Sequence, residues 1–208
     1  MKPSGRVGVA RQVASTVLPT SWGVFQMLGF ERQAHDGGPE VETAVVLIFG
    51  DLTGATPLLR IHSQCLTGDV LGSLRCDCRD QLELAMRTIC ESGCGLLIYE
   101  YQEGRGIGLM AKLQAYALQD EGLDTITANH ALGFEADYRD FSFPAALLSH
   151  LGIHRVRLLS NNPDKVRALV NAGIDLVEQI PCEIPPTPHT LVYLRIKKEQ
   201  MGHTLRLL

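Results

Sequence analysis

The sequence predicts an α/β protein, with α+β character at its N-terminus and a mixed sheet flanked by helices. Its first part is β-rich. Residues 22–31 and 41–52 are expected to pair as a hairpin around a turn signal at residues 35–39, and residues 58–65 form a further strand. Beyond residue 80, helical and extended segments alternate, which favours parallel strands with helices packed on the sheet.

The elements of the alternating part can be placed individually. Apolar residues recur at helical spacing after Asp80, and Asp80 with Glu83 fits a capping pattern, so a helix should begin near Asp80. Asn162 followed by Pro163 predicts a second helix start. The other expected segments are strands at residues 95–101, 156–160 and 174–180, and helices at residues 109–119, 144–151 and from about residue 190 onward.

Length and composition indicate one ordinary globular domain. The 208 residues are 45% hydrophobic and 20% charged, and no domain boundary is visible, so residues 1–208 are expected to form a single domain with residues 1–17 as a loose tail. The net charge of −4 argues against a nucleic-acid polymer or an anionic membrane as partner. No signal peptide or membrane-length apolar run is present. We therefore expect a cytoplasmic protein whose cysteines stay reduced.

Three of the six cysteines have metal-ligand spacing. Cys65, Cys76 and Cys78 form a C-x10-C-x-C pattern, in which two thiols lie on one side of an extended backbone and the third returns to them. Three thiolates around zinc leave a fourth position for water, as in a catalytic site, and the helix expected near Asp80 would favour ionised thiols. A structural zinc site with His62 as fourth ligand, and a simple cluster of buried thiols, remain alternatives.

Two strand-to-helix junctions have features of anion-binding turns. Residues 103–108 are rich in glycine and place backbone N–H groups and a helix N-terminus together. Residues 160–163 form the second junction, with Lys165 in the first turn of the helix, where a cation opposes the helix dipole unless an anion lies nearby. Taken alone, the first junction is better explained as a tight turn whose glycines are required by φ. At the second, a solvated lysine and an anion-binding lysine are equally consistent with the sequence.

These features occur together in one known family. The segments RIHSQCLTGDVLGSLRCDCRDQLE, YQEGRGIGLMAKLQAYALQD, DTITANHALGFEADYRDF and LLSNNPDKV closely resemble GTP cyclohydrolase II, and the resemblance extends from about Leu58 to about Met201. That family's domain is often fused to a dihydroxybutanone-phosphate synthase domain. The region before residue 58 is too short to hold one, so the stand-alone form is expected.

The resemblance implies a reaction. The family opens the imidazole ring of GTP, releases formate and pyrophosphate, and forms 2,5-diamino-6-hydroxy-4-(5-phosphoribosylamino)pyrimidine, the first committed intermediate of riboflavin biosynthesis. It further implies one zinc ion per subunit, magnesium with the triphosphate, and a homodimer.

The resemblance also assigns residues. Cys65, Cys76 and Cys78 match the zinc ligands. The positions that bind GTP match Arg60, Ile61, His62, Ser63, Gln64, Gln81, Glu103, Gly104, Arg105, Thr125, Ser160 and Lys165. Among the catalytic positions, Asp137 matches the proton acceptor, Arg139 the residue that acts on the α-phosphate, and Tyr116 a tyrosine near C8. A guanidinium stays protonated in nearly every environment, so stabilising charge is a simpler role for Arg139 than nucleophilic attack.

The chain departs from some family members at Gln64, Ser160 and Tyr101, where those members have Glu, Thr and Arg. Two other functions use similar parts. A zinc nucleobase deaminase would show H-x-E with P-C-x-x-C, and neither pattern occurs. A zinc-stabilised nucleotide sensor would bind GTP without turning it over.

Overall fold

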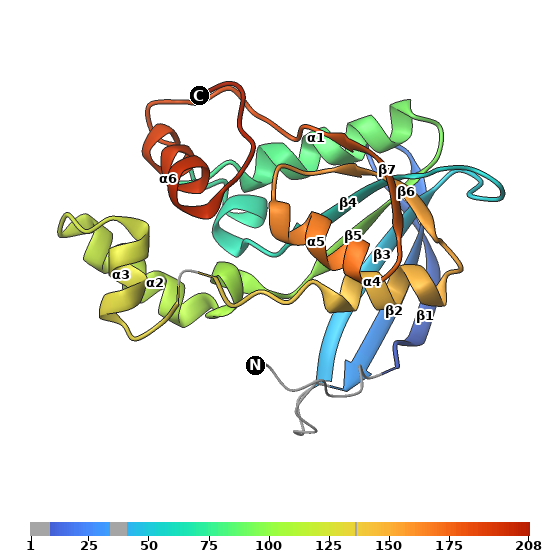
Figure 1. Cartoon of the computed structure of the whole chain (residues 1–208), viewed down its shortest axis with the longest axis horizontal. Coiled ribbons are helices and arrows are strands. Elements are labelled where there is room, and N and C mark those ends of the chain that lie inside the picture. The colour runs from blue at the N-terminus through green and yellow to red at the C-terminus, as the bar shows by residue number, and fades with distance from the viewer. Residues whose placement is uncertain (1–8, 34–40, 136) are drawn as a thin grey trace.

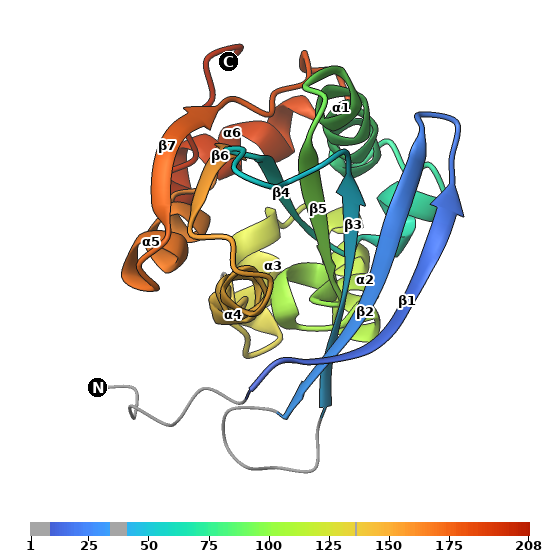
Figure 2. The ribbon, with the colours of Figure 1, turned by 90° about the vertical axis from the view of Figure 1, so that its right-hand side faces the viewer.

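The fold is built on one seven-stranded mixed sheet. The structure is a computed structural model that describes residues 9–33, 41–135 and 137–208. The strand order is β1-β2-β3-β5-β4-β6-β7, seen in Figure 2 from β7 at the left to β1 at the right. The strands are β1 (Arg11–Pro19), β2 (Val24–Gln33), β3 (Val41–Phe49), β4 (Leu58–Ser63), β5 (Gly95–Glu100), β6 (Arg155–Leu159) and β7 (Asp175–Ile180). The predicted mixed sheet is confirmed.

The N-terminal half of the sheet is antiparallel. β2 pairs with β3 from Gln33↔Val41 onward, which confirms the predicted hairpin, although its turn at residues 35–39 lies outside the described residues. The predicted loose tail is wrong for residues 11–17, because β1 pairs with β2 along its length. β1 is an edge strand whose side chains are mostly exposed, so it lacks the apolar alternation that reveals a buried strand.

The C-terminal half is parallel, as the alternation of elements predicted. β4 pairs in parallel with β5 and β6, and β6 with β7. Successive residues of each strand face opposite sides. Leu59, Leu96 and Leu158 therefore pack under α4 (Ser142–His150) and α5 (Pro163–Asn171), while Leu58 and Leu97 pack under α1 (Cys78–Glu91). Helices thus cover both faces of this half.

The helix boundaries show one error and one omission. α1 begins at Cys78, with Asp77 as N-cap, so the predicted start near Asp80 is two residues late. Asn162 caps α5 as predicted, its side-chain oxygen accepting a bond of 2.8 Å from the Asp164 N–H. α3 (Thr125–Ala131) was not predicted, because seven residues display too little periodicity. The remaining helices are α2 (Leu109–Asp120) and α6 (Leu191–Met201).

The carboxyl ends of β4 and β5 point to one end of the molecule. Figure 1 shows α2, α3 and α6 gathered at that end. β4 runs into a π-helical turn (Leu66–Val70) and β5 into a 3-10 turn (Glu103–Gly106). In open α/β sheets, ligands bind beyond the carboxyl ends of the parallel strands. The fold therefore favours a ligand site at this end of the molecule.

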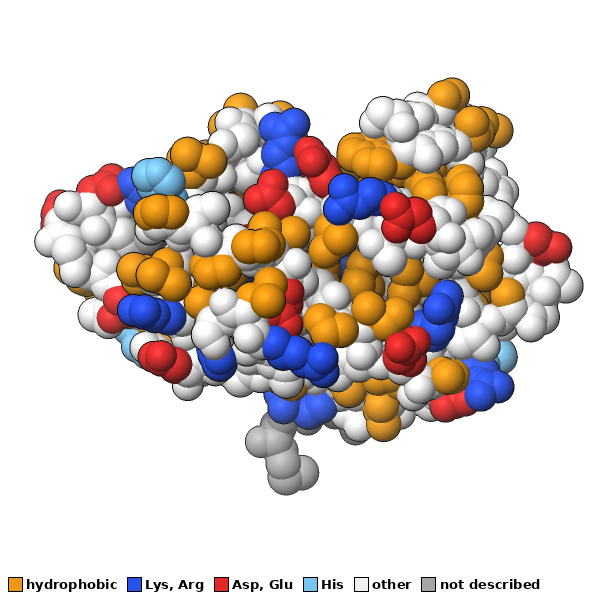
Figure 3. All heavy atoms as spheres, turned by 90° about the horizontal axis from the view of Figure 1, so that it is seen from above, with side chains coloured by type: hydrophobic (Ala, Val, Ile, Leu, Met, Phe, Trp, Pro, Cys, Tyr) orange, Lys and Arg blue, Asp and Glu red, His pale blue; other side chains and the backbone are white. Residues whose placement is uncertain are grey.

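On the face seen in Figure 3, acidic and basic side chains lie interspersed among apolar ones, so neither sign of charge dominates that face. Within the described ranges, every helix is too short or too polar to cross a bilayer.

Strand β5 ends in a buried carboxylate. Glu100 is only 2% exposed, and its Oε1 accepts a hydrogen bond of 2.8 Å from Gln102 Nε2. Its Oε2 has no hydrogen-bond partner among the described residues. Burial raises the pKa of Glu100 from 4.5 to about 7, although the positive charge of Lys165 opposes the shift.

This carboxylate should make stability depend on pH. The folded-state pKa of Glu100 lies above its unfolded value. The contribution of Glu100 to the free energy of unfolding is therefore fully present below pH 4.5 and is lost as the pH rises through about 7. Between pH 5.5 and 8, wild type should lose about 2 kcal/mol of unfolding free energy relative to Glu100→Gln. Urea unfolding at both pH values measures the difference. Parallel pH profiles of wild type and variant would contradict it, and Glu91→Gln, at an exposed position, is the control.

Candidate active site

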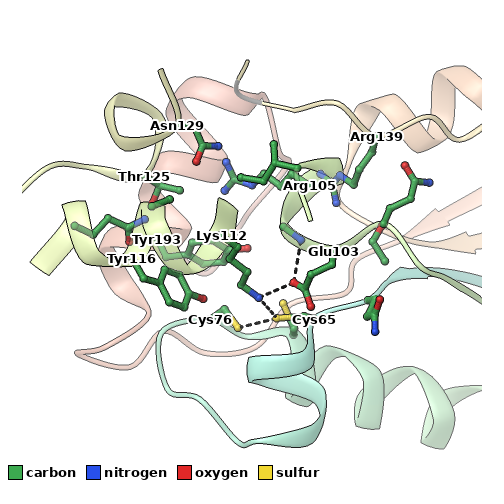
Figure 4. A pocket seen from close by; sticks show the side chains of 18 residues that line it. Cys65, Cys76, Glu103, Arg105, Lys112, Tyr116, Thr125, Asn129, Arg139 and Tyr193 are labelled. Atoms are coloured by element: carbon green, nitrogen blue, oxygen red, sulfur yellow. Dashed lines mark hydrogen bonds and ion pairs between the residues drawn. The ribbon is translucent and has the colours of Figure 1, made fainter. Parts of the chain in front are cut away.

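Three thiols meet where β4 and α1 approach each other. The Sγ atoms of Cys65 and Cys76 are 3.7 Å apart, and the Sγ atoms of all three cysteines lie within 4.8 Å of one another. Two sulfurs bound at ~2.3 Å to a tetrahedral zinc ion are ~3.8 Å apart, so this spacing fits that metal. Figure 4 shows Cys65 and Cys76 at the base of a cavity.

The local backbone explains why the thiols converge. Cys65 immediately precedes the π-helical turn, while Cys76 and Cys78 flank Asp77, the N-cap of α1. The turn brings Gly68 against the cluster. A Cβ at Gly68 would lie 2.9 Å from Cys76 Sγ and 3.2 Å from Cys65 Sγ, so only glycine fits without displacing a thiol. The prediction that a helix N-terminus faces the thiols is confirmed for α1.

The three thiols differ in the direction in which their surroundings shift the pKa. Hydrogen bonds from Cys76 and Cys78, together with the nearby Lys112 ammonium, lower the pKa of Cys65. The same contact with Cys65 raises the pKa of Cys76 to about 11, and the pKa of Cys78 is also raised by its sulfur neighbours. The protein alone therefore favours one thiolate and two thiols. A divalent cation among the sulfurs would favour ionisation of all three.

A buried ion pair fixes Cys65. Lys112 Nζ donates to Cys65 Sγ at 3.1 Å and to Glu103 Oε1 at 2.7 Å. Glu103 Oε2 accepts from the Leu66 N–H at 2.7 Å, and its Oε1 also accepts from the Gly104 N–H at 2.9 Å. Burial opposes the charge of Lys112, but the hydrogen bond to Glu103 and the negative charges nearby raise its pKa. The Glu103 carboxylate, predicted to bind GTP, is thus occupied in bracing the thiol loop.

His62 is not part of the thiol group. Its Nε2 lies 3.1 Å from Asp69 Oδ1, and its ring stacks on Tyr99. Asp69 in turn accepts from the Cys65 N–H at 3.0 Å and from the Tyr99 hydroxyl at 2.8 Å. Among the described residues, only Cys65, Cys76 and Cys78 form a group that could hold a metal ion. The alternative of a structural site completed by His62 is therefore wrong.

Two adjoining cavities open beside the thiols. The first, here called the thiol cavity, takes its lining from predicted site residues that include Cys65, Cys76, Gln64, Glu103, Gly104, Tyr116 and Thr125. The second, the cationic cavity, is lined by Arg60, His62, Gln81, Ser160, Lys165, Lys197 and His203. Ser63, Cys78, Arg105, Arg139 and Tyr193 line both. The thiols and the cationic groups therefore border one continuous site.

The cationic cavity contains donors that the protein does not satisfy. Several buried polar atoms have no hydrogen-bond partner among the described residues: Arg60 Nε, Ser63 Oγ, Asn162 Nδ2 and both terminal nitrogens of Arg105. Buried donors are normally paired, so such a set needs an explanation. Arg105 also adopts a φ of +62°, which is strained for a residue with a side chain. A polyanion would satisfy both the charges and the donors.

The burial of Lys165 also indicates that an anion binds in the cationic cavity. It is 4% exposed, and its Nζ donates to the Ile61 carbonyl at 2.8 Å. Burial, followed by the positive charges of Arg60 and Arg139, holds the pKa of Lys165 well below its ordinary value. The same cause lowers the pKa of His203 to about 3: burial first, then the charge of Lys197 and its cationic neighbours. An anion in this cavity would relieve both groups.

Arg139 faces the site with its charge secured by Asp137. Arg139 Nε donates to Asp137 Oδ1 at 2.9 Å, and Nη2 donates to Oδ2, which makes a bidentate pair. Burial opposes the charge, but these bonds raise the pKa of Arg139. Figure 4 shows Arg105 and Arg139 across the cavity from the thiols. Asp137 lines neither cavity, and its contact with the site is the bond to Arg139.

Some predicted residues lie differently from expectation. Ile61 is fully buried in the core and offers the site only its carbonyl oxygen. Tyr116 lines the thiol cavity beneath the Arg75 guanidinium, and burial raises its pKa. Tyr101, which stands where some family members have Arg, is 53% exposed and lines neither cavity. A charge at that position would therefore lie outside both cavities.

Sequence reasoning missed several lining residues. Lys112 stands four residues before Tyr116 on α2, so both lie on one helix face, and this spacing could have indicated it. Asn129 on α3 could not be placed without that helix. Tyr193, Lys197 and His203 come from the C-terminal segment, where the sequence analysis expected a helix and assigned no site residue.

Known proteins match this chain over nearly its whole length. Residues 10–181 match the family GTP cyclohydrolase II. GTP cyclohydrolase-2 of Escherichia coli O9:H4 (strain HS) and that of Escherichia coli (strain K12 / DH10B) are each 52% identical over 198 residues, or 94% of this chain and 97% of theirs. Among solved structures, a two-domain 3,4-dihydroxy-2-butanone 4-phosphate synthase from A. baumannii has a TM-score of 0.45 and 16% identity, covering 83% of this chain and 40% of that chain.

The sequence resemblance noted at the outset is thus confirmed independently. A match over residues 10–181 and 52% identity across 94% of the chain establish that this protein belongs to the GTP cyclohydrolase II family.

Proposed function

We propose that this enzyme hydrolyses GTP, opening the imidazole ring, releasing C8 as formate and removing pyrophosphate, as the first step of riboflavin biosynthesis. The observation that carries the proposal is the joining of two cavities, one with three thiols and one with unsatisfied buried cations and donors. The first suits a metal beside a purine ring, and the second suits a triphosphate. A nucleoside triphosphate presents both chemistries at once.

Zinc is the proposed metal, held by Cys65, Cys76 and Cys78, with one ion per subunit. Soft thiolate ligands at tetrahedral spacing favour it. When bound, zinc supplies a Lewis acid that can activate water for attack on C8. Lys112 and Glu103 would hold the Cys65 thiolate in place during the reaction, while Gly68 keeps the cluster compact.

The triphosphate would occupy the cationic cavity. Arg60, Arg105 and Lys165 would neutralise its charge, Ser63, Asn162 and Ser160 would donate hydrogen bonds, and magnesium would accompany it. Gln64 and Thr125, which line the thiol cavity, would contact the nucleoside. His62 and Gln81 line the cationic cavity beside Arg60, whose Nη2 donates to Gln81 Oε1 at 2.8 Å.

Arg139 would stabilise charge on the α-phosphate during pyrophosphate release. Its bidentate bond to Asp137 raises its pKa, which is the reverse of what a nucleophilic guanidine needs. Asp137 would therefore orient Arg139 and keep it protonated. Tyr116, on the wall of the thiol cavity, is positioned to orient the opened ring or relay a proton near C8.

The remaining features of the proposal concern the context of the enzyme. We expect a cytoplasmic, single-domain homodimer that meets GTP as a free nucleotide and binds neither nucleic-acid polymers nor membranes. Incubating pure protein with GTP separates the possible activities. The proposed enzyme releases formate, a deaminase would release ammonia, and a sensor would release neither.

Replacing one thiol should remove both the metal and the reaction. In Cys76→Ser, zinc content should fall from about one equivalent to near zero, and formate release should fall at least ~100-fold, because losing a ligand costs more than losing its supporting bond. Elemental analysis and a formate assay measure both quantities, and Cys94→Ser, outside the cluster, is the matched control. A zinc-free Cys76→Ser protein with full activity would refute the assignment.

Lys165 should act mainly in binding. Removing one charge-assisted contact to a phosphate costs about 1.5–3 kcal/mol, or roughly 10–100-fold in the Kd for GTP. In Lys165→Ala, calorimetry should show this loss, while the single-turnover rate of formate release at saturating GTP should change much less. Lys198→Ala, at an exposed lysine, is the control. Unchanged affinity for GTP would remove Lys165 from the site.

A further inference from the structure

The C-terminal helix borders the site, although the sequence analysis assigned none of its residues to it. The family match ends at residue 181, whereas α6 covers Leu191–Met201. Tyr193 of this helix lines both cavities, and Lys197 lines the cationic cavity. Figure 1 shows the N-terminal end of α1 turned toward α6.

The residue between two of the thiols provides the connection. Asp77 is the N-cap of α1, a position at which an aspartate normally accepts hydrogen bonds from the first N–H groups of the helix. Here its side chain caps nothing. Asp77 is only 2% exposed. Its carboxylate instead accepts a hydrogen bond of 2.8 Å from Lys197 Nζ and one of 2.5 Å from Gln81 Nε2. The carboxylate is thus used to hold α6 rather than to cap α1.

Lys197 is itself confined. It is 8% exposed, and its Nζ lies 4.4 Å from the centre of the Tyr193 ring, a cation–π contact one helical turn away. A mobile surface lysine would be free to leave the carboxylate, whereas this one is held on two sides. The segment after α6 is also anchored, because Asn161 Nδ2 donates to the Thr204 carbonyl at 2.9 Å and the Thr204 N–H donates to the Asn161 carbonyl at 3.1 Å.

The ion pair also connects the turn between two of the thiols to the cationic cavity. From Asp77 the chain of hydrogen bonds continues through Gln81, whose Oε1 accepts a hydrogen bond of 2.8 Å from Arg60 Nη2. Arg60 lines the cationic cavity, and its Nη1 donates to the Leu159 carbonyl at 3.1 Å. One carboxylate therefore receives bonds that reach α6 on one side and an arginine of the cationic cavity on the other.

We propose that Lys197 is a positioning residue of the metal centre: by holding the Asp77 carboxylate it fixes the turn from Cys76 to Cys78 so that both thiols face Cys65. The C-terminal helix is then a working wall of the active site. This inference rests on the proposed zinc site. Residues that support metal ligands in this way are typically worth 10–100-fold in metal affinity.

Zinc affinity measured apart from catalysis tests the proposal. Metal-depleted wild type, Lys197→Met and Lys198→Met are titrated with zinc against a chromophoric chelator, and then with cobalt to record the thiolate-to-cobalt charge-transfer bands. Lys197→Met should bind zinc about 10–100-fold more weakly and show altered bands, because the turn is no longer held. Lys198→Met makes the same change one residue along, at an exposed position, and should match wild type. Wild-type affinity and bands in Lys197→Met would overturn the proposal.

A second variant covers the case in which a buried, unpaired carboxylate prevents folding. Asp77→Asn combined with Lys197→Met removes that charge and keeps an acceptor for Gln81. This double variant should fold by circular dichroism yet still bind zinc weakly, since nothing ties the turn to α6. Wild-type zinc affinity in the folded double variant would mean that Lys197 only balances a charge, and would overturn the proposal. If wild type itself bound no zinc, the zinc site of the proposed function would fail instead.

Discussion

Three sulfur atoms within 4.8 Å of one another cannot all carry negative charge unless a cation lies among them. This constraint organises the end of the molecule where β4 and β5 finish. Lys112 donates to Cys65, the N-terminus of α1 faces the cluster, and Gly68 brings backbone where any side chain would push the sulfurs apart. Each of these features stabilises thiolates without filling the place of a metal.

The neighbouring cavity has the opposite imbalance. Arg60, Arg105, Arg139 and Lys165 line one cavity, in which burial and the positive charges of Arg60 and Arg139 disfavour the charge of Lys165. Several buried donors of this cavity have no hydrogen-bond partner among the described residues. Such an arrangement costs folding free energy in the absence of a ligand and lowers the cost of binding a polyanion. Because the two cavities share walls, a ligand that carries both a purine and phosphates satisfies them together.

Much of the site could be predicted because its parts are local. The short C-x-C pattern, the glycine-rich turn and the Asn162 cap each depend on residues a few positions apart, and the family resemblance added positions such as Arg60, Lys165 and Arg139. The errors also have local causes. β1 lacks an apolar face, α3 is too short for its period to be seen, and Asp80 with Glu83 imitates a capping box that Asp77 pre-empts.

The sequence by itself determined the α/β class and the grouping of Cys65, Cys76 and Cys78, because spacing and periodicity act over short stretches of chain. The resemblance to a known family then assigned the two strand-to-helix junctions to the nucleotide. Only the tertiary structure decided what surrounds them. It paired the Glu103 carboxylate with Lys112 and buried Ile61 in the core. It also joined Asp77 to Lys197, which is 120 residues away. Contacts between residues so distant depend on how the helices pack on the sheet, and no local pattern records that.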